Sequence, residues 1–108
     1  MATIKISKNT NSKYYYQIMT DEMPETFRSD GYVKKTDCLI AIEQARLFIN
    51  DKTCIRIQET ADRKWRFVVT GSDRSVVGRS APFNSQRQCF SYIIRMRNDL
   101  NNADIISE

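Results

Sequence analysis

The hydrophobic positions along the chain follow two periods, one of two residues and one of three to four. Apolar side chains recur at every second position in Ile4–Ser7 and again in Tyr14–Ile18, and this alternation predicts two half-buried β-strands. We expect a third short strand over about Glu25–Ser29, after a polar turn. Further along, apolar residues fall at helical spacing, which predicts a helix with one buried face. The stripe of that helix consists of Cys38, Ile42, Ala45 and Ile49.

The same order of patterns recurs when the sequence is shifted by 51 positions. The residues that coincide include Ile4 with Ile55, Tyr14 with Trp65, Arg28-Ser29 with Arg79-Ser80, and Cys38 with Cys89. The second copy predicts a third strand over Val76–Ser80 and a helix capped by Ser85, with Gln88 at the capping-box position. In the first copy we expect Thr36 to be the cap. The second helical stripe is Cys89, Ile93, Met96 and Leu100.

Each helix is followed by another short strand, over Thr53–Gln58 and over Asp104–Ser107. The first of these strands ends one copy and begins the next, so neither copy can bury its sheet and its helix alone. We therefore predict an α+β fold of two tandem β3-α-β repeats, which share one antiparallel sheet with two helices packed on it. The 108 residues form a single domain, 1–108, with repeats at about 3–56 and 54–107.

The composition narrows the classes of function. Histidine is absent, which excludes histidine-based nucleophilic catalysis and removes the commonest metal ligand. The cysteines Cys38, Cys54 and Cys89 are odd in number and form no CxxC pair, which indicates a reduced, cytoplasmic protein without a zinc site. We expect Cys38 and Cys89 to be buried and Cys54, in the shared strand, to be partly exposed. No apolar run is long enough for a signal peptide or a membrane span, and we expect no enzyme activity and no cofactor.

The alternation also predicts which strand residues face away from the helices. The aromatic residues in phase with the core are Tyr14, Tyr16, Trp65 and Phe67. If both helices cover one side of the sheet, the other side presents three cations and one ring, from Lys5, Tyr15, Arg56 and Arg66. Proteins use this combination to bind single-stranded nucleic acid, because bases stack on the ring and phosphates contact the cations. A plain solvated sheet face fits the same pattern.

Arg28-Ser29 and Arg79-Ser80 recur at the end of the third strand of each copy. One interpretation is structural, with each serine bonded to nearby backbone and each arginine exposed or paired with a carboxylate. The other interpretation is a symmetry-related pair of anion sites. The net charge of +4 permits weak attraction to anions without requiring it.

The second copy resembles the repeat of the YegP-like family. The residues that carry this resemblance are Lys64-Trp65-Arg66-Phe67-Val68-Val69, Val77-Gly78-Arg79-Ser80, Phe83, Cys89 and Ile93. The first copy fits more loosely, through Tyr14, Tyr16, Ile18, Ser29, Tyr32, Cys38 and Ile42. The resemblance implies tandem β3-α-β units in a single sheet, with the C-terminal strands exchanged between units. The family is uncharacterised, so the resemblance implies no activity.

We therefore expect a non-enzymatic binding or interaction module of the YegP-like type, whose ligand the sequence does not identify. Its partner is an unidentified macromolecule, protein or nucleic acid, without membrane contact, and the chain is a monomer or a weak dimer. Two alternatives stay open: a weak nucleic-acid-binding protein that uses the basic sheet face, and a small inhibitor or interaction factor that acts on another protein. The residues expected to contact the partner are Lys5, Tyr15, Arg28, Arg56, Arg66 and Arg79.

Overall fold

A computed structural model of the chain describes residues 2–20 and 27–107. These residues form an α+β fold with one mixed seven-stranded sheet and two helices. The strands are β1 Thr3–Lys8, β2 Tyr14–Met19, β3 Phe27–Arg28, β4 Ile55–Glu59, β5 Trp65–Thr70, β6 Val76–Ser80 and β7 Asp104–Ser107. The helices are α1 Lys35–Phe48 and α2 Gln86–Asn102, and a short 3₁₀ turn, Lys52–Cys54, precedes β4.

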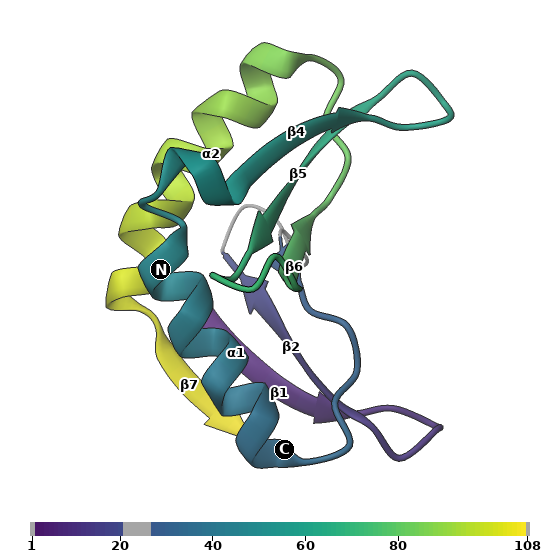
Figure 1. The fold of residues 1–108 in the computed structure, drawn as a ribbon, viewed down its shortest axis with the longest axis vertical. Coiled ribbons are helices and arrows are strands. Elements are labelled where there is room, and N and C mark those ends of the chain that lie inside the picture. The colour runs from purple at the N-terminus through teal and green to yellow at the C-terminus, as the bar shows by residue number, and fades with distance from the viewer. Residues whose placement is uncertain (1, 21–26, 108) are drawn as a thin grey trace.

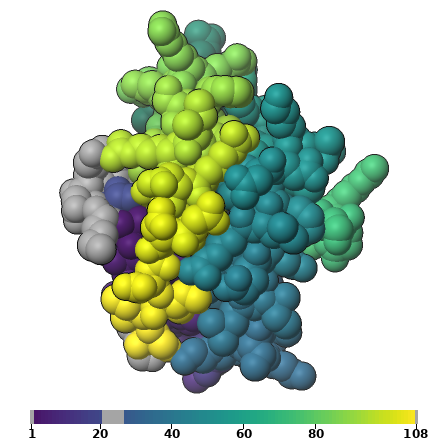
Figure 2. Space-filling view, turned by 90° about the vertical axis from the view of Figure 1, so that its left-hand side faces the viewer, coloured from purple at the N-terminus to yellow at the C-terminus, as the bar shows by residue number. Residues whose placement is uncertain are grey.

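Both helices cover the same side of the sheet. The strand order is β4-β5-β6-β3-β2-β1-β7. Figure 1 shows α1 and α2 on one side of the curved sheet and none of the described helices on the other. Viewed from the helix side, the two helices lie next to each other and hide most of the strands (Figure 2). The sequence left open whether both helices lie on one side of the sheet. They do, so the described residues leave the other side free of helices, as the predicted basic face requires.

One predicted feature of the sheet is wrong, because the sheet is not wholly antiparallel. β7 pairs with β1 in parallel, with Ile4 opposite Ile105, while the other strand pairs are antiparallel. The chain reaches β7 through α2, and a crossover helix of this kind allows a strand to return parallel to its neighbour. Alternation of apolar residues encodes which face a side chain takes, and it carries no information on strand direction.

The strand after each helix pairs with strands of the other half of the chain. After α1 the chain enters β4, which pairs with β5, and after α2 it enters β7, which pairs with β1. This arrangement agrees with the exchange of C-terminal strands that the family resemblance implies.

The core lies between the sheet and the helices, and both predicted helical stripes are buried in it. From the sheet, Ile4, Ile6, Tyr16 and Phe67 are almost fully buried, while Tyr14 and Trp65 pack on its margin. The Tyr16 hydroxyl donates a hydrogen bond to the Val77 carbonyl, which satisfies this buried phenol. Burial raises the pKa of Tyr16, so the residue remains a neutral donor.

A large and a small residue face each other where the two halves of the sheet meet. The Phe27 ring stacks on Phe67 with ring centroids 5.7 Å apart, and it also lies over Gly78. A Cβ at position 78 would stand 2.1 Å from Phe27 Cε2. Phe27 and Gly78 coincide under the shift of 51 positions, so the ring of one residue fills the space left by the absent side chain of the other.

Two predicted boundaries and the predicted exposure of one cysteine differ from the structure. Helix α1 begins after Lys34, which makes no side-chain cap bond, and the predicted cap Thr36 lies within the first turn. The predicted cap of α2 is confirmed, because the Ser85 hydroxyl accepts a hydrogen bond from the Gln88 N–H. Cys54 ends the 3₁₀ turn and is buried, so the expected partial exposure is wrong. At the start of that turn the Asp51 carboxylate accepts a hydrogen bond from the Thr53 N–H. This bond competes with pairing of Thr53 in the sheet, so β4 begins at Ile55 and not at Thr53. Of the expected third strand, the part before Phe27 lies outside the described residues.

Several contacts recur between residues related by the shift of 51 positions. Tyr14 and Tyr32 form an isolated bridge, as do Trp65 and Phe83. The Arg46 side chain donates to the Leu100 carbonyl at 3.0 Å, and Arg97 donates to the Ile49 carbonyl at 3.1 Å, so each arginine links its helix to the end of the other. These bonds satisfy carbonyls that a helix end leaves without an intrahelical partner.

Candidate functional site

The register of the sheet places a row of cations across the face opposite α1 and α2. We call this the helix-free face, and it carries Lys5, Tyr15, Arg28, Arg56, Arg66 and Arg79. Residues that stand side by side from β4 to β1 are Arg56, Val68, Arg79, Arg28, Gln17 and Lys5. Adjacent strands lie about 4.8 Å apart, so this row extends over about 24 Å. Four of its six positions are basic.

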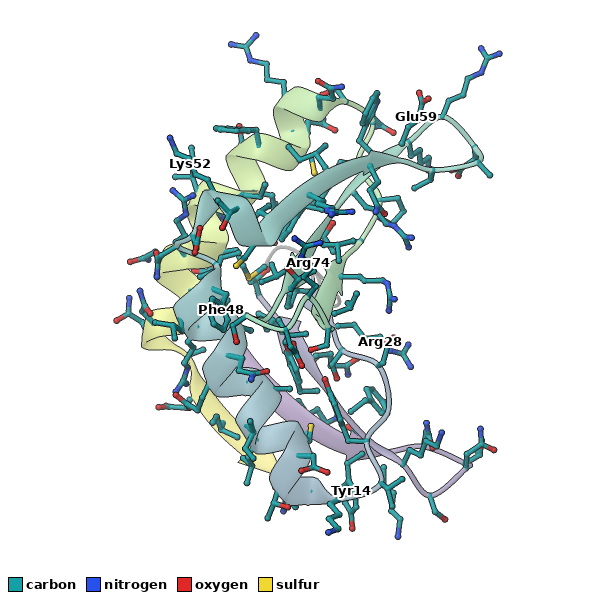
Figure 3. All side chains as sticks on the ribbon, viewed as in Figure 1. Tyr14, Arg28, Phe48, Lys52, Glu59 and Arg74 are labelled. Carbon is teal, nitrogen blue, oxygen red and sulfur yellow. The ribbon has the colours of Figure 1, made fainter. Side chains whose placement is uncertain are left out.

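Tyr15 and Arg66 lie on the same face, one pleat away from that row. Tyr15 stands opposite Ser7, and Arg66 stands opposite Gln58. The Arg28 guanidinium carbon lies 4.6 Å from the centre of the Tyr15 ring, which is close enough for a cation–π contact. The six residues predicted from the sequence to contact a partner therefore share one face, and Figure 3 shows Arg28 directed away from the helices.

Arg28 and Arg79 stand directly opposite each other at the centre of the sheet. Like charges in this position destabilise a sheet unless other groups compensate them. The Arg79 guanidinium forms an ion pair with the Asp30 carboxylate, which comes from the loop after β3. Arg28 has its cation–π contact with Tyr15, and within the described part of the chain no carboxylate pairs with it. The two arginines are thus compensated in different ways.

A cavity of about 470 Å³ opens on the helix-free face around these two arginines. It lies where β3 and β6 end and their chains turn toward opposite ends of the sheet. The polar and aromatic side chains that line it include Tyr15, Arg28, Asp30 and Arg79, and Ala81 and Pro82 complete one wall. A volume of this size falls within the usual range for small-ligand sites, about 300–1,000 Å³.

The two serines that accompany the arginines have structural roles, as one of the two interpretations predicted. Ser29 Oγ accepts from the Tyr16 N–H at 3.0 Å and donates to the Asp30 carbonyl. Ser80 Oγ accepts from the Phe67 N–H at 2.9 Å and donates to the Ala81 carbonyl. Both hydroxyl protons are engaged by backbone, so the arginines are the main donors toward the cavity.

The cysteines are placed for packing. Cys38 and Cys89 are fully buried on the helical stripes, and burial raises the pKa of each thiol to about 11. Lys35 lowers the pKa of Cys38 by a smaller amount. A thiol with so high a pKa holds little thiolate near neutral pH, and the thiolate is the reactive form. Among residues 2–20 and 27–107, no group of three or more metal-ligating side chains is close enough to hold an ion.

The described helices include none that is long and apolar enough to cross a membrane.

Sequence reasoning missed two features of this site. It did not identify Asp30 as the partner of Arg79, because the two residues are 49 positions apart in the chain. It also did not identify Gln17, which stands between Arg28 and Lys5 in the row and whose buried Oε1 has no hydrogen-bond partner among the described residues. The alternation in β2 predicts that Gln17 lies on this face. It does not indicate that this uncharged side chain takes part in the site.

Comparison with known proteins identifies the fold. No protein-family model matches the sequence, and no curated protein matches it. The solution structure of YegP from E. coli, a protein of unknown function, has a TM-score of 0.91 to this chain and covers 99% of it and 92% of its own length. The chain has the YegP fold. A UPF0339 protein from Shewanella oneidensis gives a TM-score of 0.89 and covers 98% of this chain and 90% of its own.

The sequence identities are 12% to YegP and 14% to the Shewanella protein, so the likeness concerns the fold. The resemblance to the YegP-like family inferred from the repeat residues is confirmed at that level. A likeness in fold carries no function, so the side chains of the helix-free face have to indicate it.

Proposed function

We propose that this chain is a non-enzymatic binding module whose helix-free face binds single-stranded nucleic acid. The observation that carries the proposal is the row of Arg56, Arg79, Arg28 and Lys5 across one register line of the sheet. A single-stranded nucleic acid laid along this row meets a basic side chain on four of the six β-strands that it crosses. Phosphate contacts of this kind supply most of the affinity of sequence-independent binding.

Tyr15 supports the same proposal. Its ring is partly exposed beside the row, at the cavity, and one of its contacts is the Arg28 guanidinium. Bases stack on exposed rings and on guanidinium planes with little dependence on sequence. A single ring provides one stacking position, so we expect modest affinity that depends strongly on salt.

The wider description of the protein belongs to this proposal. We infer a cytoplasmic protein, a monomer or a weak dimer, that arose by duplication of a β3-α-β unit. The support for the duplication is the set of equivalent contacts at positions separated by 51 residues, such as those of Ser29 and Ser80.

The test is a titration of fluorescently labelled single-stranded RNA or DNA, measured by anisotropy at several salt concentrations. We expect saturable binding, with a logarithmic salt slope that becomes less steep by about 0.7 for each phosphate contact removed. Arg28→Gln/Arg79→Gln removes two cations from the row. Lys52→Gln/Arg87→Gln is the matched control, because it removes the same charge from exposed positions in the 3₁₀ turn and on α2.

The proposal requires the first double variant to lose affinity and the control to retain it. Equal losses in both would show that net charge alone attracts the strand. Absence of binding at low salt, where nonspecific attraction is strongest, would overturn the proposal.

A second candidate is an interaction factor that acts on another protein. The observation in its favour is the outer side of α1, where Leu39, Ile40 and Leu47 are exposed around a shallow apolar depression. Exposed apolar side chains grouped in this way are typical of protein interfaces. Binding that survives high salt and is lost in Ile40→Lys/Leu47→Lys would favour this candidate over the first.

A further inference from the structure

We infer that the cavity between Arg28 and Arg79 is a site for a phosphate monoester, of the kind carried by a nucleotide or by the phosphorylated end of a nucleic-acid strand. This inference deepens the proposed function, because the cavity lies in the middle of the helix-free face. It makes a narrower claim than the proposed function does. A terminal phosphate is recognised there as a group, apart from any contact along the strand.

The first argument is the convergence of donors. Arg28 and Arg79 are paired residues of neighbouring strands, and both line the same cavity of about 470 Å³. Each guanidinium presents five N–H donors in a planar fork, which matches phosphate oxygens in bidentate geometry. A phosphate monoester carries between one and two negative charges near pH 7, so it suits a site with two cations better than a phosphodiester does.

The second argument is that the described residues compensate the two arginines only in part. The Asp30 carboxylate pairs with Arg79. The residue equivalent to Asp30 under the shift of 51 positions is Ala81, which lines the cavity and carries no charge. The Tyr15 ring compensates Arg28 through its face and accepts none of its N–H donors in a conventional hydrogen bond. One oxyanion is in place beside the pair, and the described residues provide no second one.

The third argument concerns Asp30 itself. Its carboxylate shows that an oxyanion reaches Arg79 at the edge of the cavity. The Asp30 side chain is 58% exposed and that of Arg79 is 36% exposed, so their pair is screened by water. A phosphate with two arginine partners can therefore displace Asp30 at small cost. In this view Asp30 is an internal competitor of the ligand.

The Tyr15 ring determines what else the ligand carries. It lines the cavity together with the apolar walls formed by Ala81 and Pro82. A flat base attached to the phosphate can contact the exposed part of this ring, which gives a nucleotide an advantage over inorganic phosphate.

The experiment measures binding of adenosine 5′-monophosphate to the full chain by isothermal titration calorimetry at low salt. Adenosine and inorganic phosphate are titrated in parallel. We expect the nucleotide to bind, inorganic phosphate to bind more weakly, and adenosine not to bind. Arg28→Gln and Arg79→Gln should each weaken nucleotide binding by tenfold or more. Arg87→Gln, exposed on α2, should leave it unchanged.

Asp30→Asn is the variant that separates this inference from simple charge attraction. It removes the competing carboxylate, and we expect the nucleotide to bind threefold to tenfold more tightly. Asn101→Lys raises the net charge by the same amount from an exposed position on α2, and we expect no change. Equal gains in these two variants would overturn the inference, as would binding of adenosine as tight as that of its monophosphate, or no binding of the nucleotide at all. Circular dichroism of each variant verifies that it is folded.

Two labelled strands of one sequence, with a 5′-phosphate or a 5′-hydroxyl, separate this inference from the proposed function. If both strands bind alike and the nucleotide does not bind, the inference fails and the proposed function stands. If the nucleotide and the phosphorylated strand bind and the hydroxyl strand does not, the inference stands and the proposed contacts along the row of cations fail. Binding of inorganic phosphate as tight as that of the nucleotide would overturn the assignment to a monoester.

Discussion

The two arginines at the centre of the helix-free face have equivalent positions and different surroundings. Arg79 has a carboxylate partner, Asp30, and its neighbour on the next strand of its own half is the basic Arg66, one pleat along. Arg28 has an aromatic ring, Tyr15, at the place equivalent to Arg66, and Ala81 at the place equivalent to Asp30. One half of the face therefore combines two cations with an acid, and the other combines a cation with a ring. Among the described residues, a carboxylate lies beside Arg79 and none pairs with Arg28.

A second difference between the halves supports the packing of the sheet. Phe27 and Gly78 coincide under the shift of 51 positions, and in the structure the Phe27 ring occupies the space above Gly78. Where positions 27 and 78 meet, two large side chains cannot share one space. Positions 27 and 78 therefore cannot both carry a large side chain in this fold.

We expect the largest loss of stability when the contact between Phe27 and Gly78 is broken. Phe27→Ala should lower the free energy of unfolding by about 3–5 kcal/mol, because it removes a buried ring. Gly78→Ala should cost about 1–3 kcal/mol, because the new Cβ would overlap the Phe27 ring. In the Phe27→Ala background the same glycine substitution should cost much less. Urea unfolding of the wild type, the two single variants and the double variant measures this coupling, and additive effects would contradict the packing described here.

The next largest loss of stability is expected at two serines that make equivalent contacts in the two halves. Ser29→Ala and Ser80→Ala each leave a buried backbone N–H, that of Tyr16 or of Phe67, without its acceptor. Each should lower the free energy of unfolding by about 1–3 kcal/mol, and the two losses should be similar. Ser72→Ala, at an exposed turn position, is the control and should have little effect. A large loss in only one of the two serine variants would show that the halves differ here as well.

The smallest effect sharpens the comparison of the arginines. Ala81→Asp gives Arg28 the acid that Arg79 already has, and should make the two halves alike. We expect labelled single-stranded RNA to bind about threefold to tenfold more weakly, a change of up to about 1.4 kcal/mol. Asn101→Asp adds the same charge on α2 and should leave the affinity nearly unchanged. Equal affinity of Ala81→Asp and the wild type would show that Arg28 does not contact the strand.

Much of this architecture could be predicted from the sequence because it depends on periodicity. The alternation in β2 and β5 placed Tyr16 and Phe67 in the core and Tyr15 and Arg66 on the opposite face, and the helical spacing identified both buried stripes. These predictions need only the geometry of a single element. The β3-α-β duplication remains a prediction, supported by the equivalent contacts.

The features that could not be predicted depend on how distant elements meet. The parallel direction of β7 follows from the path of the chain through α2. The contact of Phe27 with Gly78, and the pair of Arg79 with Asp30, join residues about fifty positions apart across the junction of β3 and β6. A single sequence records such a contact in no local pattern. The arginines of the site could therefore be named, whereas their partners could not.

The pairing of β7 with β1 has a consequence for how the protein is made. β1 leaves the ribosome before β7 does, and its outer edge is covered only when β7 has followed, with Ile105 beside Ile4. Until then that edge offers unpaired backbone groups, which in other proteins recruit strands of neighbouring chains. Translation that stops after α2 would release a product with this edge exposed. A cell that makes this protein should therefore bind such incomplete chains by chaperones or degrade them.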